Sequence, residues 1–205
     1  MSRFYRDKGV FDYCIGNKVF PALAQMSADS GDNSIKCWSA GSASGEEAYT
    51  IALIWQFVLS LDYPDMDIQI TGTEVDSNLL ERAERACYLQ SSVKELPEKW
   101  LSQAFKRTGK QYCLYQEFRE KVNFISQDIR LAAPDGPFHM VLCRNLAFTC
   151  FDISLQKEVL KRIFDSLLDG GALVIGIHES LPGGITCLHP WMPGLKIYRK
   201  GSGRF

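Results

Sequence analysis

Short apolar runs alternate with helical patterns along the chain, and this alternation constrains the fold more than any other feature. The strand-like runs cover residues 35–40, 68–73, 122–126, 138–143 and 172–177. The run at 138–143 is almost continuously apolar, as a strand covered on both faces requires. The pattern predicts an α/β fold in which helices cover both faces of a mostly parallel sheet.

Helices are expected over residues 46–61, 77–86 and 154–169. Ser77 is the expected N-cap of the second helix, and Ser154 starts the third, which a glycine pair at 170–171 ends. The segment 91–120 is less regular, and we interpret it as a small insertion within a single domain over 1–205. The C-terminal stretch is expected to form a hairpin around residues 190–194.

Composition narrows the functional classes. The net charge of −1 gives the chain no overall attraction to nucleic acid or to an anionic membrane. The apolar stretch Ala48–Leu61 is interrupted and too short to span a bilayer, so no membrane insertion is expected. The residues Met1–Asp7 lack an apolar signal core.

The seven cysteines form no C-x-x-C pair, and several lie in apolar runs, so reduced thiols in the core are expected. A cytoplasmic location follows by default. The three histidines lack the spacing of metal ligands, and no metal site is expected.

A glycine loop, Gly41–Gly45, connects the first strand to the helix that begins at Glu46. Glycines permit a sharp turn and the close approach of a ligand. A helix N-terminus favours phosphate, but Glu46 and Glu47 would repel it. The acids suit a cationic ligand such as S-adenosylmethionine, which carries an ammonium and a sulfonium. The alternative is a plain strand–helix turn whose acids interact with the helix dipole.

Three further polar side chains follow strands at the sheet edge where open α/β folds bind ligands. Glu74 is either an acceptor for both ribose hydroxyls of an adenosine or a solvated loop carboxylate. Asp128 either borders an adenine amine or is a turn residue. Arg144 leaves an apolar strand and needs a carboxylate partner. That partner is an internal acid such as Asp152 or Glu179, or it belongs to the ligand or acceptor.

Several segments, spread over almost the whole chain, occur in the order of a known family. They are residues 2–7, 38–49, 73–83, 142–145, 151–152 with Gln156, 170–173 and 176–181. Together these segments resemble the CheR-type chemoreceptor glutamate methyltransferases, and the combination is specific although no single segment is. The resemblance implies a Rossmann-like class I methyltransferase fold with a seven-stranded sheet.

The resemblance also implies a reaction, in which S-adenosylmethionine gives its methyl group to a carboxylate oxygen and leaves as S-adenosylhomocysteine. The acceptor would be a protein glutamate of a chemoreceptor or another signalling protein. A carboxylate is already deprotonated at neutral pH, so direct displacement needs alignment and no general base. This chemistry agrees with the lack of an evident nucleophile–histidine pair.

Site residues carry over by position from the family. Arg6 and Arg144 would be the catalytic residues that line the active site. Glu46 would face the methionine end of the cofactor, Glu74 the ribose, and Asp128 the adenine. The full set expected to bind the cofactor is Ser2, Arg6, Ala40, Gly41, Glu46, Glu74, Val75, Asp128, Ile129, Arg144 and Asn145.

The sequence departs from the family pattern at Ala48, Glu74 and Asp128, where the family usually has proline, aspartate and asparagine, and two larger departures concern the acceptor side. The helical domain that usually precedes the segment at Ser2–Asp7 is absent from the sequence. The tyrosine that usually follows the Arg-Asn pair is missing from residues 146–152. A different, small-molecule acceptor and an inactive cofactor-binding sensor or interaction module therefore remain alternatives. A nicotinamide dehydrogenase is disfavoured, since no G-x-G-x-x-G occurs.

Overall fold

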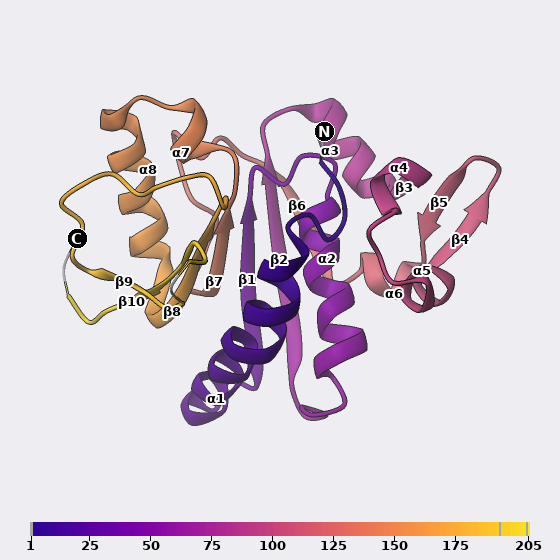
Figure 1. Cartoon of the computed structure of the whole chain (residues 1–205), viewed down its shortest axis with the longest axis horizontal. Helices are drawn as coiled ribbons and strands as arrows, with labels where there is room; N and C mark the ends of the chain where they lie inside the picture. The colour runs from indigo at the N-terminus through magenta and orange to yellow at the C-terminus, as the bar shows by residue number, and fades with distance from the viewer. Residues whose placement is uncertain (1, 193, 204) are drawn as a thin grey trace.

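A seven-stranded sheet runs through the middle of the molecule (Figure 1). The computed structural model describes residues 2–192, 194–203 and 205. The strand order is β6-β2-β1-β7-β8-β10-β9, and β10 runs in the direction opposite to that of the other strands. The strands are β1 (Ser34–Ala40), β2 (Asp67–Glu74), β6 (Val122–Ser126), β7 (Phe138–Cys143), β8 (Leu167–Ile175), β9 (Leu188–Pro190) and β10 (Ile197–Lys200). The expected mostly parallel sheet is confirmed.

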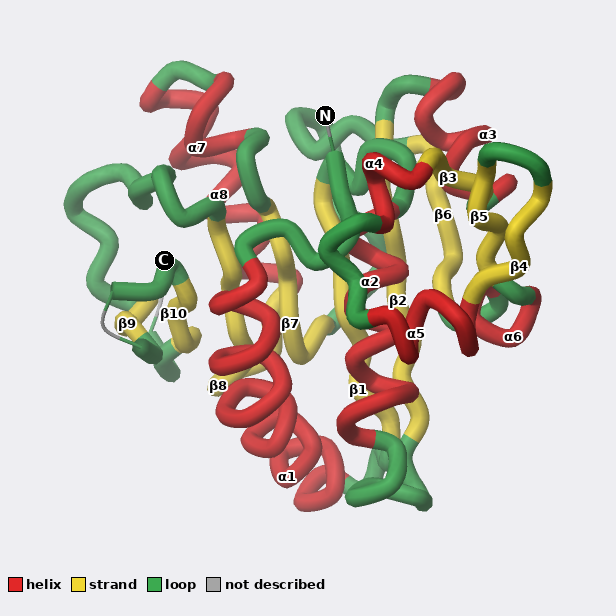
Figure 2. Tube along the Cα trace, turned by 45° about the vertical axis from the view of Figure 1, so that its right-hand side comes forward, coloured by secondary structure: helices red, strands yellow, loops and turns green. Residues whose placement is uncertain are grey.

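Helices cover both faces of this sheet (Figure 2). They include α1 (Phe20–Ser30), α2 (Glu46–Ile54) and α8 (Ile153–Ser166), and two π-helical segments, η1 (Val10–Val19) and η2 (Trp55–Leu59). Alternate strand residues face opposite sides. On β7, Met140 and Leu142 share one core cluster with α1 and α2, while Val141 and Cys143 share the other with α8.

A second, three-stranded antiparallel sheet lies beside the main one, in the order β3-β5-β4 (Figure 1). Its strands are β3 (Cys87–Leu89), β4 (Phe105–Thr108) and β5 (Gln111–Leu114), and β4 and β5 lie within the segment 91–120. The short helices around it are α4 (Gln90–Val93), α5 (Glu98–Ala104) and α6 (Gln116–Arg119). The two remaining helices, α3 (Ser77–Arg85) and α7 (Ala147–Cys150), lie at the carboxyl edge of the main sheet (Figure 1).

Several predicted element ends were wrong by one or a few residues. Asp76, and not Ser77, caps α3, because its carboxylate accepts from the backbone N–H groups of Asn78 and Leu79. Asp152 caps α8 in the same way, so the helix begins at Ile153 and not at Ser154. The predicted helix 46–61 is α-helical only to Ile54 and continues as η2.

The glycine pair at 170–171 does not end a helix, as the sequence indicated, but lies inside β8. A Cβ on Gly171 would lie 2.9 Å from the carbonyl oxygen of His139. The pairing of β7 with β8 is irregular between Phe138 and Met140, next to this contact. The glycine pair therefore marks a place where two backbones approach closely, beside the irregular pairing of β7 with β8.

The cysteines depart from the expected set of reduced core thiols. Cys37, Cys143 and Cys187 are buried and free, whereas Cys150 is free and exposed. Cys87 and Cys113 form a disulfide between β3 and β5. They are direct cross-strand partners with Cα atoms 4.0 Å apart, a register that sequence spacing does not reveal.

None of the helices in the described ranges has the length and apolar character needed to cross a membrane. Within the same ranges, no three His, Cys, Asp or Glu side chains are grouped so as to hold a metal ion.

Replacing Asp152 with alanine should lower the free energy of unfolding by about 1 kcal/mol, because the Leu155 amide loses its capping acceptor 3.0 Å away. Ser154→Ala is the matched control, since Ser154 is exposed in the first turn and caps nothing. Denaturant titration of both variants measures the difference. Equal losses would contradict the assignment of Asp152 as the cap.

Candidate functional site

The loop between β1 and α2 turns tightly against the end of β2. Gly41 has φ +67°, and a Cβ there would lie 2.5 Å from Cδ2 of Leu146, so the loop requires glycine at this position. The Ser42 amide donates to the Thr73 carbonyl at 2.9 Å. The loop is thereby fixed to the strand that carries the next acid.

Glu74 ends β2 with its carboxylate held by three backbone donors. One oxygen accepts from the Ala43 amide at 2.9 Å, and the other from the amides of Val75 and Asp76 at 2.8 and 3.1 Å. The Ala43 bond joins the end of the strand to the glycine loop. Glu74 is therefore a positioned carboxylate, and the reading as a freely solvated loop residue is wrong.

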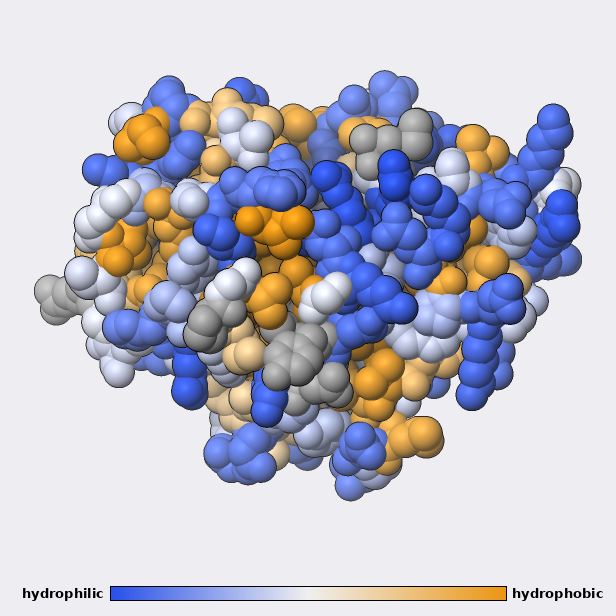
Figure 3. Space-filling view, in the orientation of Figure 1, coloured by the Kyte–Doolittle hydropathy of each residue, from blue (hydrophilic) through white to orange (hydrophobic). Residues whose placement is uncertain are grey.

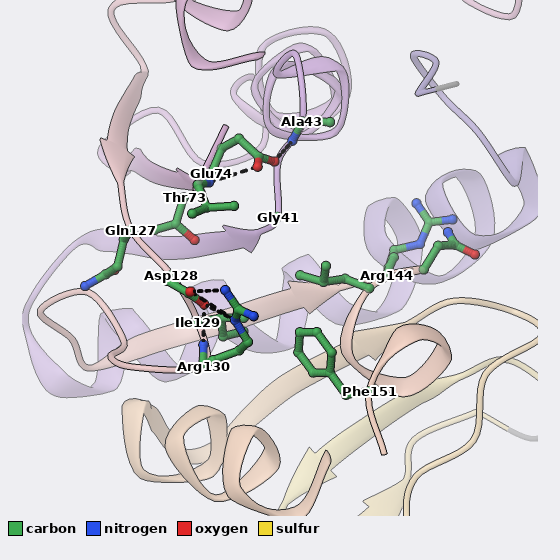
Figure 4. Close-up of a pocket in the computed structure, with 13 residues that line it drawn as sticks. Gly41, Ala43, Thr73, Glu74, Gln127, Asp128, Ile129, Arg130, Arg144 and Phe151 are labelled. Atoms are coloured by element: carbon green, nitrogen blue, oxygen red, sulfur yellow. Dashed lines mark hydrogen bonds and ion pairs between the residues drawn. The ribbon is translucent and has the colours of Figure 1, made fainter. Parts of the chain in front are cut away.

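A cavity of about 320 Å³ opens beside this carboxylate, and we name it the Glu74 cavity. Figure 4 shows Glu74 and Asp128 on one side of it, with Phe151 and Arg144 on the other. Its apolar lining comes from Ile129, Leu146 and Phe151, which belong to different loops after β6 and β7. The complete lining is Gly41, Ala43, Thr73, Glu74, Val75, Gln127, Asp128, Ile129, Arg130, Arg144, Asn145, Leu146 and Phe151.

Asp128 faces the Glu74 cavity and is paired with Arg130. The guanidinium donates to both carboxylate oxygens, with its shortest contact at 2.6 Å, and the Arg130 amide adds a bond of 2.9 Å. These bonds from Arg130 hold the pKa of Asp128 below its usual range. Asp128 thus serves as a turn residue and also presents an ionised carboxylate at the cavity wall.

Arg144 is buried between two acids from distant parts of the chain. Its guanidinium donates to Glu47 at 3.0 Å and also pairs with Asp7. The face of the Phe11 ring lies 5.1 Å from the guanidinium carbon. Glu47 in turn accepts from the Ser39 hydroxyl at 2.9 Å. The guanidinium, 3% exposed, joins the N-terminal segment to the start of α2.

The two acids named from sequence as internal partners for Arg144 are used elsewhere. Asp152 caps α8. The buried Glu179 accepts from the amides of Asn145 and Gly176 at 2.8 and 2.6 Å, and from the Thr149 hydroxyl at 2.7 Å. Asn145 has φ +55°, a backbone conformation that asparagine tolerates better than most residues. Glu179 therefore fixes the turn after β7 that carries the arginine.

A second cavity, of about 160 Å³, adjoins the first, and we name it the Arg6 cavity. The two share Gly41, Ala43, Arg144 and Asn145 in their linings. Ser2, Arg3, Arg6, Phe11, Ser42 and Glu47 complete the Arg6 cavity. Arg6 is exposed there, and within the described ranges its guanidinium forms no ion pair or hydrogen bond. It is a cation available to a ligand.

Most residues expected to form the site are brought together. Ala40 and Glu46 line neither cavity. Glu46 is buried, accepts from the Ser44 hydroxyl at 3.3 Å, and has one oxygen without a partner among the described residues. The other expected residues line one or both cavities.

Sequence reasoning missed the acids that position Arg144. Glu47 follows Glu46 at the start of α2, and Asp7 follows Arg6 in the N-terminal segment. The sequence predicted Glu46 and Arg6 as site residues. The acids that pair with Arg144 are the residues that follow them, Glu47 and Asp7. The charge of Arg144 shows that an acid is needed, but no spacing rule identifies which acid the fold brings to it.

A family model described as the SAM-binding domain of CheR methyltransferase matches residues 1–191. The chain belongs to this family. The fold is accordingly the Rossmann-like class I methyltransferase fold, and the cofactor of the family domain is S-adenosylmethionine.

Relatives of this CheR domain carry chemotaxis names. Chemotaxis protein methyltransferase 2 of Vibrio cholerae is 30% identical over 178 residues, which cover 83% of this chain and 58% of that protein. A probable chemotaxis protein methyltransferase of Rhizobium etli is 28% identical and covers 99% of this chain and 76% of that protein. An uncharacterised 104.1 kDa protein of Rhodobacter capsulatus is 28% identical over 88% of this chain, which spans only 19% of its length.

Solved methyltransferase structures also match the CheR domain. A SAM-dependent methyltransferase from Methanosarcina mazei has a TM-score of 0.44 at 15% identity, covering 70% of this chain and 52% of that one. A glycopeptide N-methyltransferase complexed with S-adenosylmethionine has a TM-score of 0.43 at 14% identity, covering 75% and 51%.

Removing the Arg144 side chain should destabilise this CheR domain by about 3 kcal/mol, because Glu47 and Asp7 would lose their shared cation in a mostly buried setting. Arg130→Ala is the control, since its pair with Asp128 is exposed on the arginine side and should be worth about 1 kcal/mol or less. Urea unfolding measures both. Similar losses in the two variants would contradict the structural role of Arg144.

Proposed function

We propose that this domain binds S-adenosylmethionine across the two adjoining cavities and transfers its methyl group to a carboxylate oxygen. The adenosine would lie in the Glu74 cavity and the methionine end in the Arg6 cavity. One observation carries the proposal: Glu74 is fixed by three backbone amides at the cavity wall, where its remaining lone pair can accept from a ribose hydroxyl.

The linings fit this ligand. The Glu74 cavity has the volume of a small-molecule site and offers apolar side chains to a base. Asp128 supplies an acceptor for an exocyclic amine beside that apolar surface. The Arg6 cavity presents the Glu47 carboxylate, an acceptor for an ammonium, together with the arginines. Bound S-adenosylmethionine would supply a methyl group already activated by its sulfonium.

The side chains of this chain then have three tasks. Glu74 and Asp128 bind and orient the nucleoside. Arg6, which is unpaired within the described ranges, holds the acceptor carboxylate beside the cavity. Arg144 holds the N-terminal segment and the start of α2 together through its ion pairs with Asp7 and Glu47. Because a carboxylate is ionised at neutral pH, alignment suffices and no side chain has to accept a proton.

We propose a protein glutamate as the acceptor, in a chemoreceptor or a related signalling protein. The names of the Vibrio and Rhizobium relatives support a chemotaxis role. The exposed guanidinium of Arg6 at the second cavity, unpaired within the described ranges, suits an anionic side chain presented from outside. A small carboxylic acid would present the same carboxylate group to Arg6. A methyl-transfer assay in which the two classes of acceptor compete distinguishes between them.

A catalytically silent cofactor-binding module is the second candidate, favoured by the composition of α7. This helix follows the Arg144-Asn145 turn and carries no tyrosine, and its aromatic residue Phe148 is buried. No phenol hydroxyl therefore enters the site from this helix. Retained binding of S-adenosylhomocysteine with no methyl transfer to any protein in a lysate would favour the module over the enzyme.

Glu74→Ala should weaken binding of S-adenosylhomocysteine by roughly 1–3 kcal/mol, the scale of hydrogen bonds to a charged group. Glu74→Gln is a second variant, which keeps the side-chain shape and one acceptor oxygen. Glu81→Ala, on the exposed side of α3, is the matched control. Isothermal titration calorimetry measures affinity, and thermal melting checks that each variant is folded. Unchanged affinity in a folded Glu74→Ala protein would refute the ribose role.

Arg6→Ala should lower kcat/KM for the acceptor about a hundredfold while changing S-adenosylhomocysteine affinity much less, since a charged hydrogen bond worth ~3 kcal/mol to the acceptor is lost. Arg3→Ala is the control, because Arg3 lies at the same cavity but is paired with Glu95. Transfer of labelled methyl groups to acceptor protein gives the rates. Equal effects in both variants would assign Arg6 a general electrostatic role only.

A further inference from the structure

The Cys87–Cys113 disulfide lies on the outer side of the small sheet, on the strand that supports the glycine loop. Both cysteines are half-buried, so a small reagent has access to them. Side chains alternate along a strand, so Tyr88, the next residue, points to the opposite, inner side and is buried. The disulfide joins β3 to β5 at the edge of the small sheet.

Tyr88 connects this strand to both halves of the candidate site. Its hydroxyl donates to the carbonyl of Ser44, in the glycine loop, at 2.7 Å. Its ring packs edge-on against Phe4, with centroids 4.8 Å apart. Phe4 lies two residues before Arg6, and its amide donates to the Ser92 carbonyl at 3.0 Å. A shift of β3 would therefore displace both the glycine loop and the N-terminal segment that carries Arg6.

A basic cavity of about 510 Å³ leads to Cys87, and we name it the Arg82 cavity. Arg82, Arg85 and Arg119 line it together with Cys87 and Gln111. Within the described ranges, Arg82 and Arg85 form no ion pair, and Arg119 donates to the backbone carbonyl of Glu84 at 2.7 Å. Hydrophilic residues cover much of the side of the molecule on which the small sheet lies (Figure 3).

We propose that Cys87 and Cys113 form a thiol–disulfide exchange site for an anionic low-molecular-weight thiol of the glutathione class. The Arg82 cavity attracts the carboxylates of such a thiol and places its sulfur at Cys87. A neutral thiol gains nothing from the three guanidinium groups.

The exchange proceeds in two balanced steps. The incoming thiolate attacks Sγ of Cys87, forms a mixed disulfide there, and releases Cys113 as a thiolate. A second thiolate attacks the mixed disulfide, giving the oxidised small-molecule disulfide and the Cys87 thiolate. The protein gains two electrons, and both cysteine thiolates take up protons from water. In the reverse direction Cys113 resolves the mixed disulfide and expels the small thiol.

Reduction removes the covalent tie between β3 and β5 and leaves β3 held by the hydrogen bonds of a short edge strand and by the packing of Tyr88. Tyr88 then holds the Ser44 carbonyl less firmly, so the glycine loop is less well ordered for its ligand. This consequence rests on the proposed function, whereas the exchange chemistry does not. We expect reduction to weaken S-adenosylhomocysteine binding about two- to tenfold, which corresponds to one net hydrogen bond.

The first experiment tests the exchange site with single-cysteine variants. Cys113→Ser and Cys87→Ser are each treated with oxidised glutathione and with neutral hydroxyethyl disulfide, and peptide mass mapping locates the adduct. Cys87 in the first variant should react with glutathione about tenfold faster than Cys113 in the second, since steering by charge raises association rates on this scale. Arg82→Ala with Arg85→Ala should remove this preference and leave the neutral reagent unaffected.

The matched control for the arginine variant is Lys18→Ala with Lys157→Ala, which removes the same charge from exposed positions on η1 and α8. Equal reactivity of Cys87 and Cys113, or an arginine variant that reacts as fast as this control, would overturn the exchange site. The same is true if excess reduced glutathione leaves the disulfide intact in the wild-type protein. Peptide mapping separates these adducts from those on the exposed Cys150.

The second experiment measures S-adenosylhomocysteine affinity of the oxidised and reduced wild-type protein by calorimetry. Tyr88→Phe lacks the hydroxyl that contacts Ser44, so its affinity should no longer depend on redox state. Equal affinities of the two wild-type forms would refute the link from the disulfide to the loop. Absence of binding in both forms would instead refute the proposed function, and the glutathione results would stand by themselves.

Discussion

The burial of one guanidinium organises the candidate site. Arg144 leaves a strand whose residues are all buried, and so its charge must be neutralised inside the protein. Glu47 and Asp7 do this from two other parts of the chain, and Arg144 itself lines both cavities. Arg144 is therefore a positioning residue, and the exposed cation beside it is Arg6. The acceptor-binding role that we propose therefore belongs to Arg6, whereas the sequence offered a ligand carboxylate as a partner for Arg144.

The two acids that we propose bind the nucleoside are held by neighbouring parts of the chain. Glu74 is held by amides of the glycine loop and of its own turn, and Asp128 is held by Arg130. Both acids are thus oriented without any bound ligand, which reduces the ordering cost of binding. The proposed acceptor side differs, because it depends on a short N-terminal segment with two non-glycine residues at positive φ, Tyr5 and Asp7. Such positions persist only where surrounding contacts enforce them.

The sequence alone predicted the sheet and the strands near the site, because hydrophobic periodicity and turn chemistry are local signals. Nine of the eleven residues expected to bind the cofactor, a set carried over from the family resemblance, line a cavity. The sequence placed helix ends less well, since Asp76 and Ser77, or Asp152 and Ser154, are all acceptable caps and only geometry selects one. It failed where long-range pairing decides the outcome. The partners of Arg144 and the register that joins Cys87 to Cys113 depend on the assembled fold.

The contact between Asp7 and Arg144 joins residues 137 positions apart. On a ribosome, Asp7 is synthesised before Arg144, so this contact forms only after the whole stretch between them has been made. The Arg6 cavity is therefore complete only when the N-terminal segment has docked against the turn after β7, so its shape depends on a contact between two parts of the chain that lie far apart in sequence.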